Sequence, residues 1–290
     1  MDTANLSAFL AVAEHASFSR AGDQLHLTQP AISKRIATLE QQLGARLFDR
    51  IGRHVTLTEA GRALKPRAEQ IINALSDTQR ALSNLSSRVQ GRLSMATSHH
   101  IGLHRLPPVL RSYTVNYPDV ALDIDFLDSE VAYAKVLHGE IELAVITLAP
   151  AVEPPIVARA IWDDPLDFVV APEHPLAALP QVSLAQLAVY PAVFPGANTF
   201  THNVVSQLFQ QRGVTPQISM STNYLETIKM MVSIGLAWSV LPRTMLDQQV
   251  TALTVPGVNL QRQLGVIWHS GRTLSNAARA LVSQLDRKQM

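Results

Sequence analysis

"SFSRAGDQLHLTQPAISKRI", residues 17–36, contains two short apolar stripes at helical spacing, with "HLTQP" between them. Ala21 and Leu25 form the inner face of a first helix. Thr28 is a suitable N-cap for a second helix, and Pro30 fits its first turn because the first N–H groups of a helix have no intrahelical partner. The stretch therefore predicts two helices joined by a turn of about three residues.

The second helix is expected to run to about Gly44, since glycine commonly ends helices. Its apolar residues recur at spacings of four, three and four, which predicts one buried stripe. They are Ile32, Ile36, Leu39 and Leu43. The outer face carries Gln29 and Ser33, which can reach base edges, and Lys34, which can reach phosphate or guanine. The positive charges of Lys34 and Arg35 indicate that this helix binds DNA. The alternative is that they lie on a helix face that is simply exposed to solvent.

The neighbouring residues extend this unit on both sides. A helix with one apolar face is expected over about 3–15. "LFDRIGRHVTLTEAG", residues 47–61, predicts two extended segments with a turn at "IGRH". Arg50 and Arg53 would lie on this hairpin, a wing whose guanidinium groups can enter the minor groove or clamp phosphates.

The chain has 290 residues, a net charge of +1 and no cysteine. Residues 18–67 contain nine basic and four acidic residues, whereas residues 91–290 contain 13 basic and 15 acidic ones. This asymmetry indicates a polyanion partner for the N-terminal block alone. The lack of cysteine excludes disulfides and thiolate metal sites. The longest apolar run, residues 230–241, is too short to span a bilayer, and no signal peptide is expected, so we expect a cytoplasmic protein without membrane contact.

A long helix is predicted from Thr58 to about Arg88. Its apolar residues fall in two heptad columns, which favours pairing with a second copy of the same helix. One column contains Leu64, Ile71, Thr78 and Leu85, and the other contains Ala68, Leu75, Leu82 and Val89. The alternative is a helix that packs on its own domain.

The pattern from Asn5 to Gly61, which includes "SFSRAG", "LTQPAISKRI" and "LFDR", resembles the DNA-binding domain of LysR-type transcriptional regulators. Gly22 stands where that family usually has alanine, and glycine is expected to loosen the second helix slightly. Position by position, the resemblance implies DNA contacts at Gln29, Pro30, Ser33, Lys34, Arg50 and Arg53.

The resemblance also implies how the whole chain is organised. A winged helix-turn-helix would occupy residues 1–58, a dimerising linker helix 59–90 and an effector-binding domain 91–290. The implied assembly is a homodimer or homotetramer on double-stranded DNA, at an interrupted palindromic promoter site. RNA polymerase is a further candidate partner, and no cofactor is expected.

From Gly91 onward, strand-like and helix-like segments alternate, which predicts an α/β domain. The phrases "NYPDVAL", "PEHPLA" and "SIGLAWSVLP" resemble the LysR effector domain, which is similar to type 2 periplasmic binding proteins. This resemblance implies two α/β lobes around a cleft. The first lobe is expected to comprise residues 91–163 and 268–290, and the second residues 164–267.

Clefts in such folds open at the carboxyl ends of strands, where helix N-termini offer unpaired N–H groups. Several hydroxyl, amide and imidazole side chains are expected there, with few fixed charges nearby, which suits a small anionic effector. They are Ser98, His99, His100, Thr147, Thr199, His202 and Asn223. Alternatively, these histidines are structural, or His99, His100 and His202 bind a metal; we expect no metal.

A second interpretation of the whole chain is an α/β enzyme or solute-binding protein with an incidental helical head. The sequence contains no G-x-S-x-G, no H-E-x-x-H and no glycine-rich phosphate loop. A ligand-responsive DNA-binding regulator without enzymatic activity is therefore the favoured prediction.

Overall fold

The computed structural model describes residues 1–51, 54–86 and 88–286. The chain divides into two units, Met1–Ser86 and Ser87–Met290, each with its own hydrophobic core. Among these described residues, no helix is long and apolar enough to cross a membrane.

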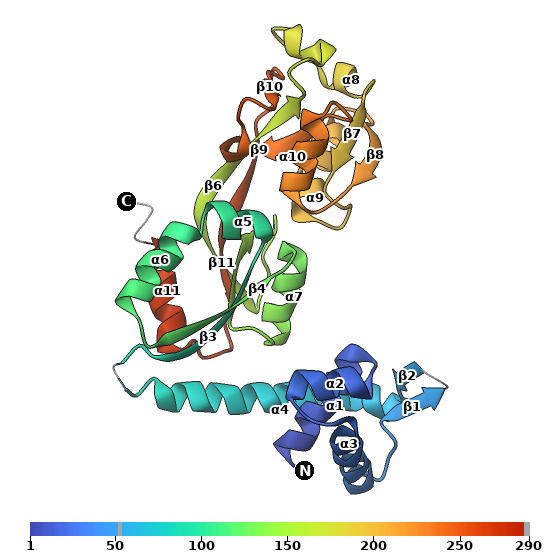
Figure 1. The fold of residues 1–290 in the computed structure, drawn as a ribbon, viewed down its shortest axis with the longest axis vertical. Coiled ribbons are helices and arrows are strands. Elements are labelled where there is room, and N and C mark those ends of the chain that lie inside the picture. Colours follow the sequence, from blue (N-terminus) through green and yellow to red (C-terminus); the bar gives the residue numbers. More distant parts are fainter. Residues whose placement is uncertain (52–53, 87, 287–290) are drawn as a thin grey trace. The chain divides into compact units, whose positions relative to one another are not determined.

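The first unit has the predicted winged helix-turn-helix fold (Figure 1). Its elements are α1 (Thr3–His15), α2 (Phe18–Leu25), α3 (Gln29–Leu43), β1 (Phe48–Ile51), β2 (His54–Leu57) and α4 (Glu59–Ser83). The Thr28 hydroxyl caps α3 by accepting a hydrogen bond from the Ala31 N–H (3.4 Å), and Gly44 ends the helix with φ +66°. Local sequence signals therefore set both ends of α3 as predicted.

The core of this unit contains most of the predicted apolar stripe. Ile32, Ile36 and Leu39 are completely buried against Phe9 and its neighbours. Leu43 is 42% exposed, so the prediction that it belongs to the buried stripe is wrong. It is the last residue of α3, where the helix runs past the core.

Gly22 has a different role from the one predicted. A Cβ atom at this position would lie 2.6 Å from the Leu27 carbonyl oxygen, which is closer than two such atoms can approach. The Leu27 N–H donates to the Gly22 carbonyl (2.8 Å), so the turn folds directly back onto α2. Glycine permits this close approach, and the expected loosening of the helix is not its main effect.

Helix α4 ends earlier than predicted, and its two halves differ in environment. Ala68 is completely buried in the head core, and Leu64 packs against the same core. Farther along, apolar side chains are exposed at heptad spacing: Ile71 (38%), Leu75 (42%) and Leu82 (64%). Leu85 and Val89 lie beyond the end of the helix, and Val89 packs against the core of the second unit. The first half of the predicted seam is therefore a contact within the head, and Leu85 and Val89 do not extend it.

The second unit is the predicted α/β domain. Its helices are α5 (His99–His104), α6 (Pro107–Asn116), α7 (Ser129–His138), α8 (Leu184–Leu187), α9 (Phe200–Gln211), α10 (Leu225–Ser233) and α11 (Asn276–Asp286), with 3₁₀ turns η1 (Pro175–Ala178) and η2 (Arg243–Met245). Its strands are β3 (Gly91–Thr97), β4 (Val120–Phe126), β5 (Leu143–Thr147), β6 (Ile156–Val170), β7 (Pro191–Phe194), β8 (Gln217–Ser221), β9 (Ser239–Pro242), β10 (Thr251–Leu253) and β11 (Leu260–His269). The main sheet has the order β10-β6-β11-β5-β3-β4, with β9 paired to β6, and β7 pairs with β8.

Alternating residues of the sheet face different helices. On β5, Leu143 and Val145 pack with α6 and α11, whereas Ala144 and Ile146 pack with α7. The helices accordingly cover both faces of the sheet (Figure 1). Because both faces are buried, the strand is apolar along its whole length, as is typical of strands in α/β domains.

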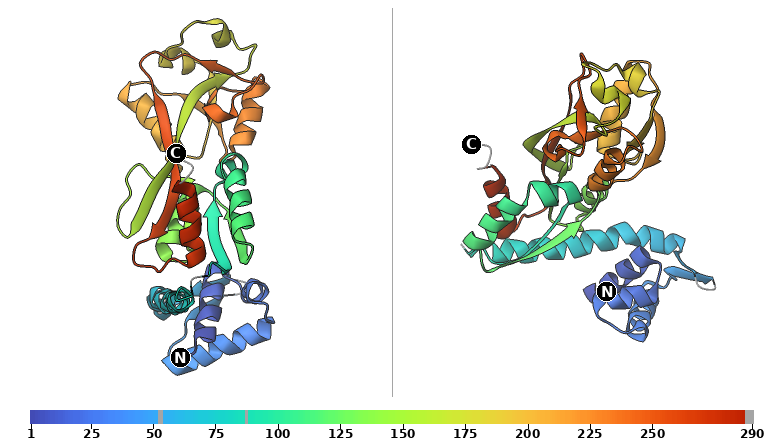
Figure 2. Two further views of the ribbon diagram at one scale, coloured as in Figure 1. Left: turned by 90° about the vertical axis from the view of Figure 1, so that its left-hand side faces the viewer. Right: turned by 45° about the horizontal axis from the view of Figure 1, so that its top comes forward.

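Strands β6 and β11 run side by side from one lobe into the other (Figure 2). On β6, Trp162 packs with the core of the first lobe (lobe I), and Leu166 packs with the core of the second lobe (lobe II). On β11, Leu264 belongs to the core of lobe I and Leu260 to the core of lobe II. Each strand therefore passes from one lobe to the other within these intervals. On β6 this interval includes the expected boundary at 163/164. On β11 the residues from Leu264 onward belong to lobe I, so the boundary lies earlier than the expected 267/268.

Candidate functional sites

Helix α3 presents a polar face to solvent. Gln29, Pro30 and Lys34 are exposed and Ser33 is partly exposed. The Gln29 amide donates to the Ser33 hydroxyl (3.0 Å), which holds the two polar side chains together at the start of the helix. Four of the six residues expected to contact DNA are thus adjacent on one accessible surface.

The other basic residues of this region have different positions. The Arg35 guanidinium donates to the Ala4 carbonyl (3.3 Å), so it ties α3 to α1, and a DNA contact by this residue stays a prediction. Arg50 is in β1, paired with Val55 across the hairpin, but its side chain lies outside the described part of the chain. Arg53 lies outside the described residues altogether.

A narrow pocket lies between the two lobes of the second unit. Its volume is about 50 Å³, which is room for one or two water molecules. It is lined by Ser98, His99, His100, Asp128, Ser129, Glu130, Thr147, Pro195, Thr199, Thr201, Asn223, Leu225 and Arg262. This inter-lobe pocket therefore includes every expected effector residue except His202.

His202 is held away from the inter-lobe pocket. Its ring nitrogen Nδ1 lies 2.9 Å from the Pro195 carbonyl oxygen, and its ring lies edge-on to Phe194. Only its backbone N–H takes part in the local structure of the pocket wall, by donating to the Thr199 hydroxyl (3.1 Å). His202 is thus a structural histidine in this conformation, and its expected role as an effector donor is not supported.

The expected polar residues are available as donors to different degrees. The Ser98 hydroxyl makes no capping hydrogen bond at the start of α5 within the described structure. Thr199 caps α9 and donates to the Gly196 carbonyl (2.8 Å). The His99 ring packs against Phe126 and Tyr224, with ring centroids 5.7 and 4.9 Å away. Within the described structure the hydroxyls of Ser98 and Thr147 make no hydrogen bond, so both are available to a ligand.

The expectation of few fixed charges is wrong. Asp128 and Glu130, at the start of α7 in lobe I, both line the inter-lobe pocket and both bond to lobe II. Glu130 Oε1 accepts from the Phe200 N–H (2.6 Å), and Asp128 Oδ2 accepts from the Asn223 amide (2.6 Å). Two carboxylates thus bridge the cleft.

A buried ion-pair network lies next to the same pocket and contributes Arg262 to its lining. Asp164 is completely buried between Arg262, whose Nε lies 2.8 Å from Oδ2, and Arg105, whose Nη2 lies 3.1 Å from Oδ1. Arg262 is 7% exposed and also donates to the Thr201 hydroxyl (2.6 Å). Its remaining terminal nitrogen has no partner among the described residues. Arg262 is therefore a buried cation with one donor group available to a ligand.

His100 is nearly buried beside this network, with 5% of its surface exposed. Burial and, to a smaller extent, the neighbouring Arg262 guanidinium lower the pKa of the His100 imidazole to about 4. Neither of its ring nitrogens has a hydrogen-bond partner among the described residues. His100 is thus a neutral imidazole at neutral pH with two unused nitrogen atoms.

The charged residues of the pocket are absent from the residues predicted from the sequence, for two different reasons. Asp128 follows β4 and precedes α7, so the rule that led to Ser98 and Thr199 also applies to it and to Glu130. Arg262 and Asp164 lie within long strands, and no local signal distinguishes a buried charged residue there from an exposed one. Their pairing depends on the register of β6 against β11.

A second, wider pocket of about 670 Å³ shares Thr147 and Arg262 with the first. Most of its other lining residues have apolar side chains, among them Leu148, Val152 and Phe200. Converging polar groups and a buried charge are more typical of a specific binding site. The inter-lobe pocket is therefore the better candidate for an effector.

Comparison with known proteins identifies the family. Residues 86–289 match the family described as "LysR substrate binding domain", and residues 3–62 match "Bacterial regulatory helix-turn-helix protein, lysR family". The chain belongs to the LysR family of transcriptional regulators. Like its relatives it is a DNA-binding regulator with an effector-binding domain, and it is not an enzyme.

Individual relatives agree with this assignment. The RuBisCO operon transcriptional regulator of Allochromatium vinosum is 30% identical over 95% of this chain and 92% of its own length. Full-length CbnR, solved with its target DNA, covers 100% of both chains at 22% identity with a TM-score of 0.66. The effector-binding domain of QuiR, solved with shikimate, covers 69% of this chain and 97% of its own at 19% identity (TM-score 0.63). At these identities the structural likeness shows a shared fold.

Proposed function

We propose that this LysR-type regulator binds an interrupted palindromic promoter site as a homodimer or homotetramer, and that a small anionic effector in the inter-lobe pocket controls it. Gln29 and Ser33 read bases, Lys34 contacts phosphate or guanine, and Arg50 and Arg53 hold the wing on the duplex. Pro30 shapes the start of α3. RNA polymerase is the further partner proposed for the DNA-bound assembly.

The exposed seam of α4 supports the oligomeric assembly. Ile71, Leu75 and Leu82 lie at heptad positions of one helix and are 38–64% exposed. A stripe of this kind is typical of a helix that pairs with a second copy of itself. Two heads joined through such a pair would be related by a two-fold axis, which is the reason to expect a palindromic site.

The observation that carries the effector proposal is the position of Glu130. Its carboxylate accepts a hydrogen bond from the first N–H group of α9. Helix N-termini attract anions through their unpaired N–H groups and the helix dipole. An effector carboxylate that displaces Glu130 would find the same donors, together with the unused Arg262 nitrogen and the Ser98 hydroxyl.

The chemistry of the effector is narrowed by the two carboxylates. Asp128 and Glu130 repel a bare anion, but they accept hydrogen bonds from hydroxyl or amino groups. The best fit is a carboxylate that also carries such donors, and the lobes must move apart to admit it, because the pocket has room for only one or two water molecules. QuiR is similar in fold and was solved with shikimate, a hydroxylated carboxylate, which is consistent with this class.

The effector proposal is tested by a binding screen on the full-length protein. Small hydroxycarboxylates and amino acids are compared with their neutral amides by thermal shift and then by calorimetry. Ser98→Ala should weaken binding by about 1–3 kcal/mol, because a buried anion loses a donor. Thr199→Ala should also weaken it, because it removes the cap that holds the N-terminus of α9 in place. Equal affinity for acids and amides, or unchanged affinity in both variants, would contradict an anion at this position.

A further inference from the structure

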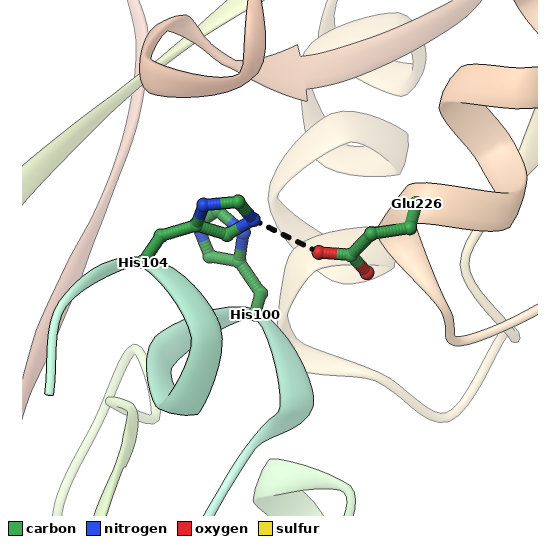
Figure 3. A group of neighbouring side chains, drawn as sticks. All are labelled: His100, His104 and Glu226. Carbon is green, nitrogen blue, oxygen red and sulfur yellow. Dashed lines mark hydrogen bonds and ion pairs between the residues drawn. The ribbon is translucent and has the colours of Figure 1, made fainter. Parts of the chain in front are cut away.

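Helix α5 brings two histidines together beside the inter-lobe pocket. His100 and His104 are one helical turn apart, and their ring centroids are 4.9 Å from each other. Glu226, in the first turn of α10, approaches them from the other lobe (Figure 3). His104 Nε2 lies 3.1 Å from Glu226 Oε1, and one ligand atom of each residue lies within 4.8 Å of the other two.

His100 supplies an independent reason to look for a ligand here. It is 95% buried, and both of its ring nitrogens lack a hydrogen-bond partner within the described chain. Buried polar atoms in native proteins are nearly always paired, so an unpaired imidazole calls for an explanation. A bound cation would use one of these lone pairs.

We propose that His100, His104 and Glu226 form a site for a divalent transition metal of the zinc class, with one ligand contributed across the cleft. Two imidazoles and one carboxylate are a common donor set for a catalytic-type or exchangeable zinc site, which keeps a fourth position for water. The site adjoins the proposed effector position, since His100 also lines the inter-lobe pocket, but it uses neither the α9 N-terminus nor Arg262. It does not depend on the identity or the charge of the effector.

The geometry requires only a small adjustment. Metal–ligand bonds of about 2.0–2.1 Å in a tetrahedron place neighbouring donor atoms about 3.4 Å apart. His104 and Glu226 are already at 3.1 Å, and the remaining separations, up to 4.8 Å, are shortened by side-chain rotation. The exposed fractions of the His104 and Glu226 side chains are 39% and 38%, so a metal ion can enter from solvent.

The surrounding charges set the strength of the site. Arg262 lies close enough to His100 to disfavour its protonation, and it will oppose a cation in the same way. Asp164 partly offsets this effect, although its carboxylate is already shared by Arg262 and Arg105. We therefore expect binding that is reversible and sensitive to chelators.

Metal binding would also act on the lobes. Its ligands lie on α5 of lobe I and α10 of lobe II, so the ion binds best when these helices are close. A ligand that prefers one arrangement of two lobes shifts the population toward that arrangement. The metal would thus stabilise the closed cleft beside the effector.

The test uses untagged full-length protein, because a histidine tag would bind metal itself. Co²⁺ is titrated under visible absorption spectroscopy, and Zn²⁺ is counted by elemental analysis after dialysis. We expect one ion per chain and the intense visible bands of four-coordinate Co²⁺. His104→Gln and Glu226→Gln, both at partly exposed positions, should weaken Co²⁺ binding at least about tenfold, the lower bound seen when outer-shell partners are lost.

His99→Gln is the matched control, because His99 precedes His100 but its ring packs on Phe126 and Tyr224 outside the cluster. It should keep the wild-type affinity. Circular dichroism and thermal unfolding establish that each variant is folded. Failure of the wild-type protein to bind Co²⁺ at micromolar concentrations would overturn the proposal, as would the same affinity in wild type, His104→Gln and Glu226→Gln.

Discussion

The Glu130 carboxylate of lobe I accepts a 2.6 Å hydrogen bond from the N–H of Phe200, the first residue of α9 in lobe II. A protein carboxylate thus occupies the position that an effector anion would take. It contributes a fixed negative charge to the pocket and a contact between the lobes. Binding of an anion there must displace it or extend beyond it.

Glu130→Gln should therefore strengthen binding of a carboxylate effector by several-fold. The amide removes a negative charge from the pocket and competes less well for the helix N-terminus. Calorimetry with a carboxylate found in the screen measures the change. Glu140→Gln, which alters an exposed ion pair with Lys135, is the control and should have no effect. Weaker binding in Glu130→Gln would mean that Glu130 contacts the effector directly as an acceptor.

Arg262→Ala should destabilise the second unit by about 3–5 kcal/mol, because it leaves the Asp164 carboxylate buried with only Arg105 as a partner. Arg243→Ala is the control: its two hydrogen bonds to Asp167 are formed at the surface, where water screens such pairs and they add little stability. Urea unfolding of both variants provides the comparison. Similar losses for the two arginines would show that the buried pair of Arg262 with Asp164 stabilises the unit no more than a surface pair does.

Gln29→Ala should relax sequence preference by about 1–3 kcal/mol at one base pair, whereas Lys34→Ala should weaken specific and random DNA together if it meets phosphate. The structure places both side chains on the exposed face of α3. Mobility shifts with operator and random duplexes, repeated at several salt concentrations, separate the two effects. A uniform loss for Gln29→Ala on all sequences would exclude it as a base reader.

Replacing Leu75 and Leu82 by glutamate should convert the oligomer to monomers and greatly weaken DNA binding, because charges cannot be buried in an apolar seam without a large cost. Gln70→Glu, at an exposed polar position of the same helix, is the matched control. Sedimentation velocity reports the oligomeric state. An unchanged oligomer in the double variant would place the interface elsewhere.

Gly22→Ala should destabilise the head by about 1–3 kcal/mol, the usual cost of forcing an extra methyl group into a packed site. The new Cβ atom would lie 2.6 Å from the Leu27 carbonyl oxygen, so the turn between α2 and α3 must move. Thermal unfolding of the full-length protein measures the effect. A neutral or stabilising result would show that helix propensity, which favours alanine, outweighs the contact.

The sequence by itself determined the features that depend on near neighbours in the chain. Thr28 and Gly44 delimit α3 because caps act within one helical turn, and the α/β alternation follows from the periodicity of each segment. The general rule that clefts of α/β domains open at the carboxyl ends of strands, next to helix N-termini, predicted that Ser98, Thr147 and Thr199 lie close together, and they line one pocket.

Only the tertiary structure decided which distant residues meet in and around the inter-lobe pocket. Glu130 and Phe200 are 70 positions apart, Asp164 and Arg262 are 98 apart, and His104 and Glu226 are 122 apart. These pairs depend on strand register and on the packing of the lobes. Neither of these two features produces a periodic pattern in the sequence from which it could be predicted. Charge is tolerated inside the pocket because these distant partners satisfy it, and that compensation exists only once the chain has folded.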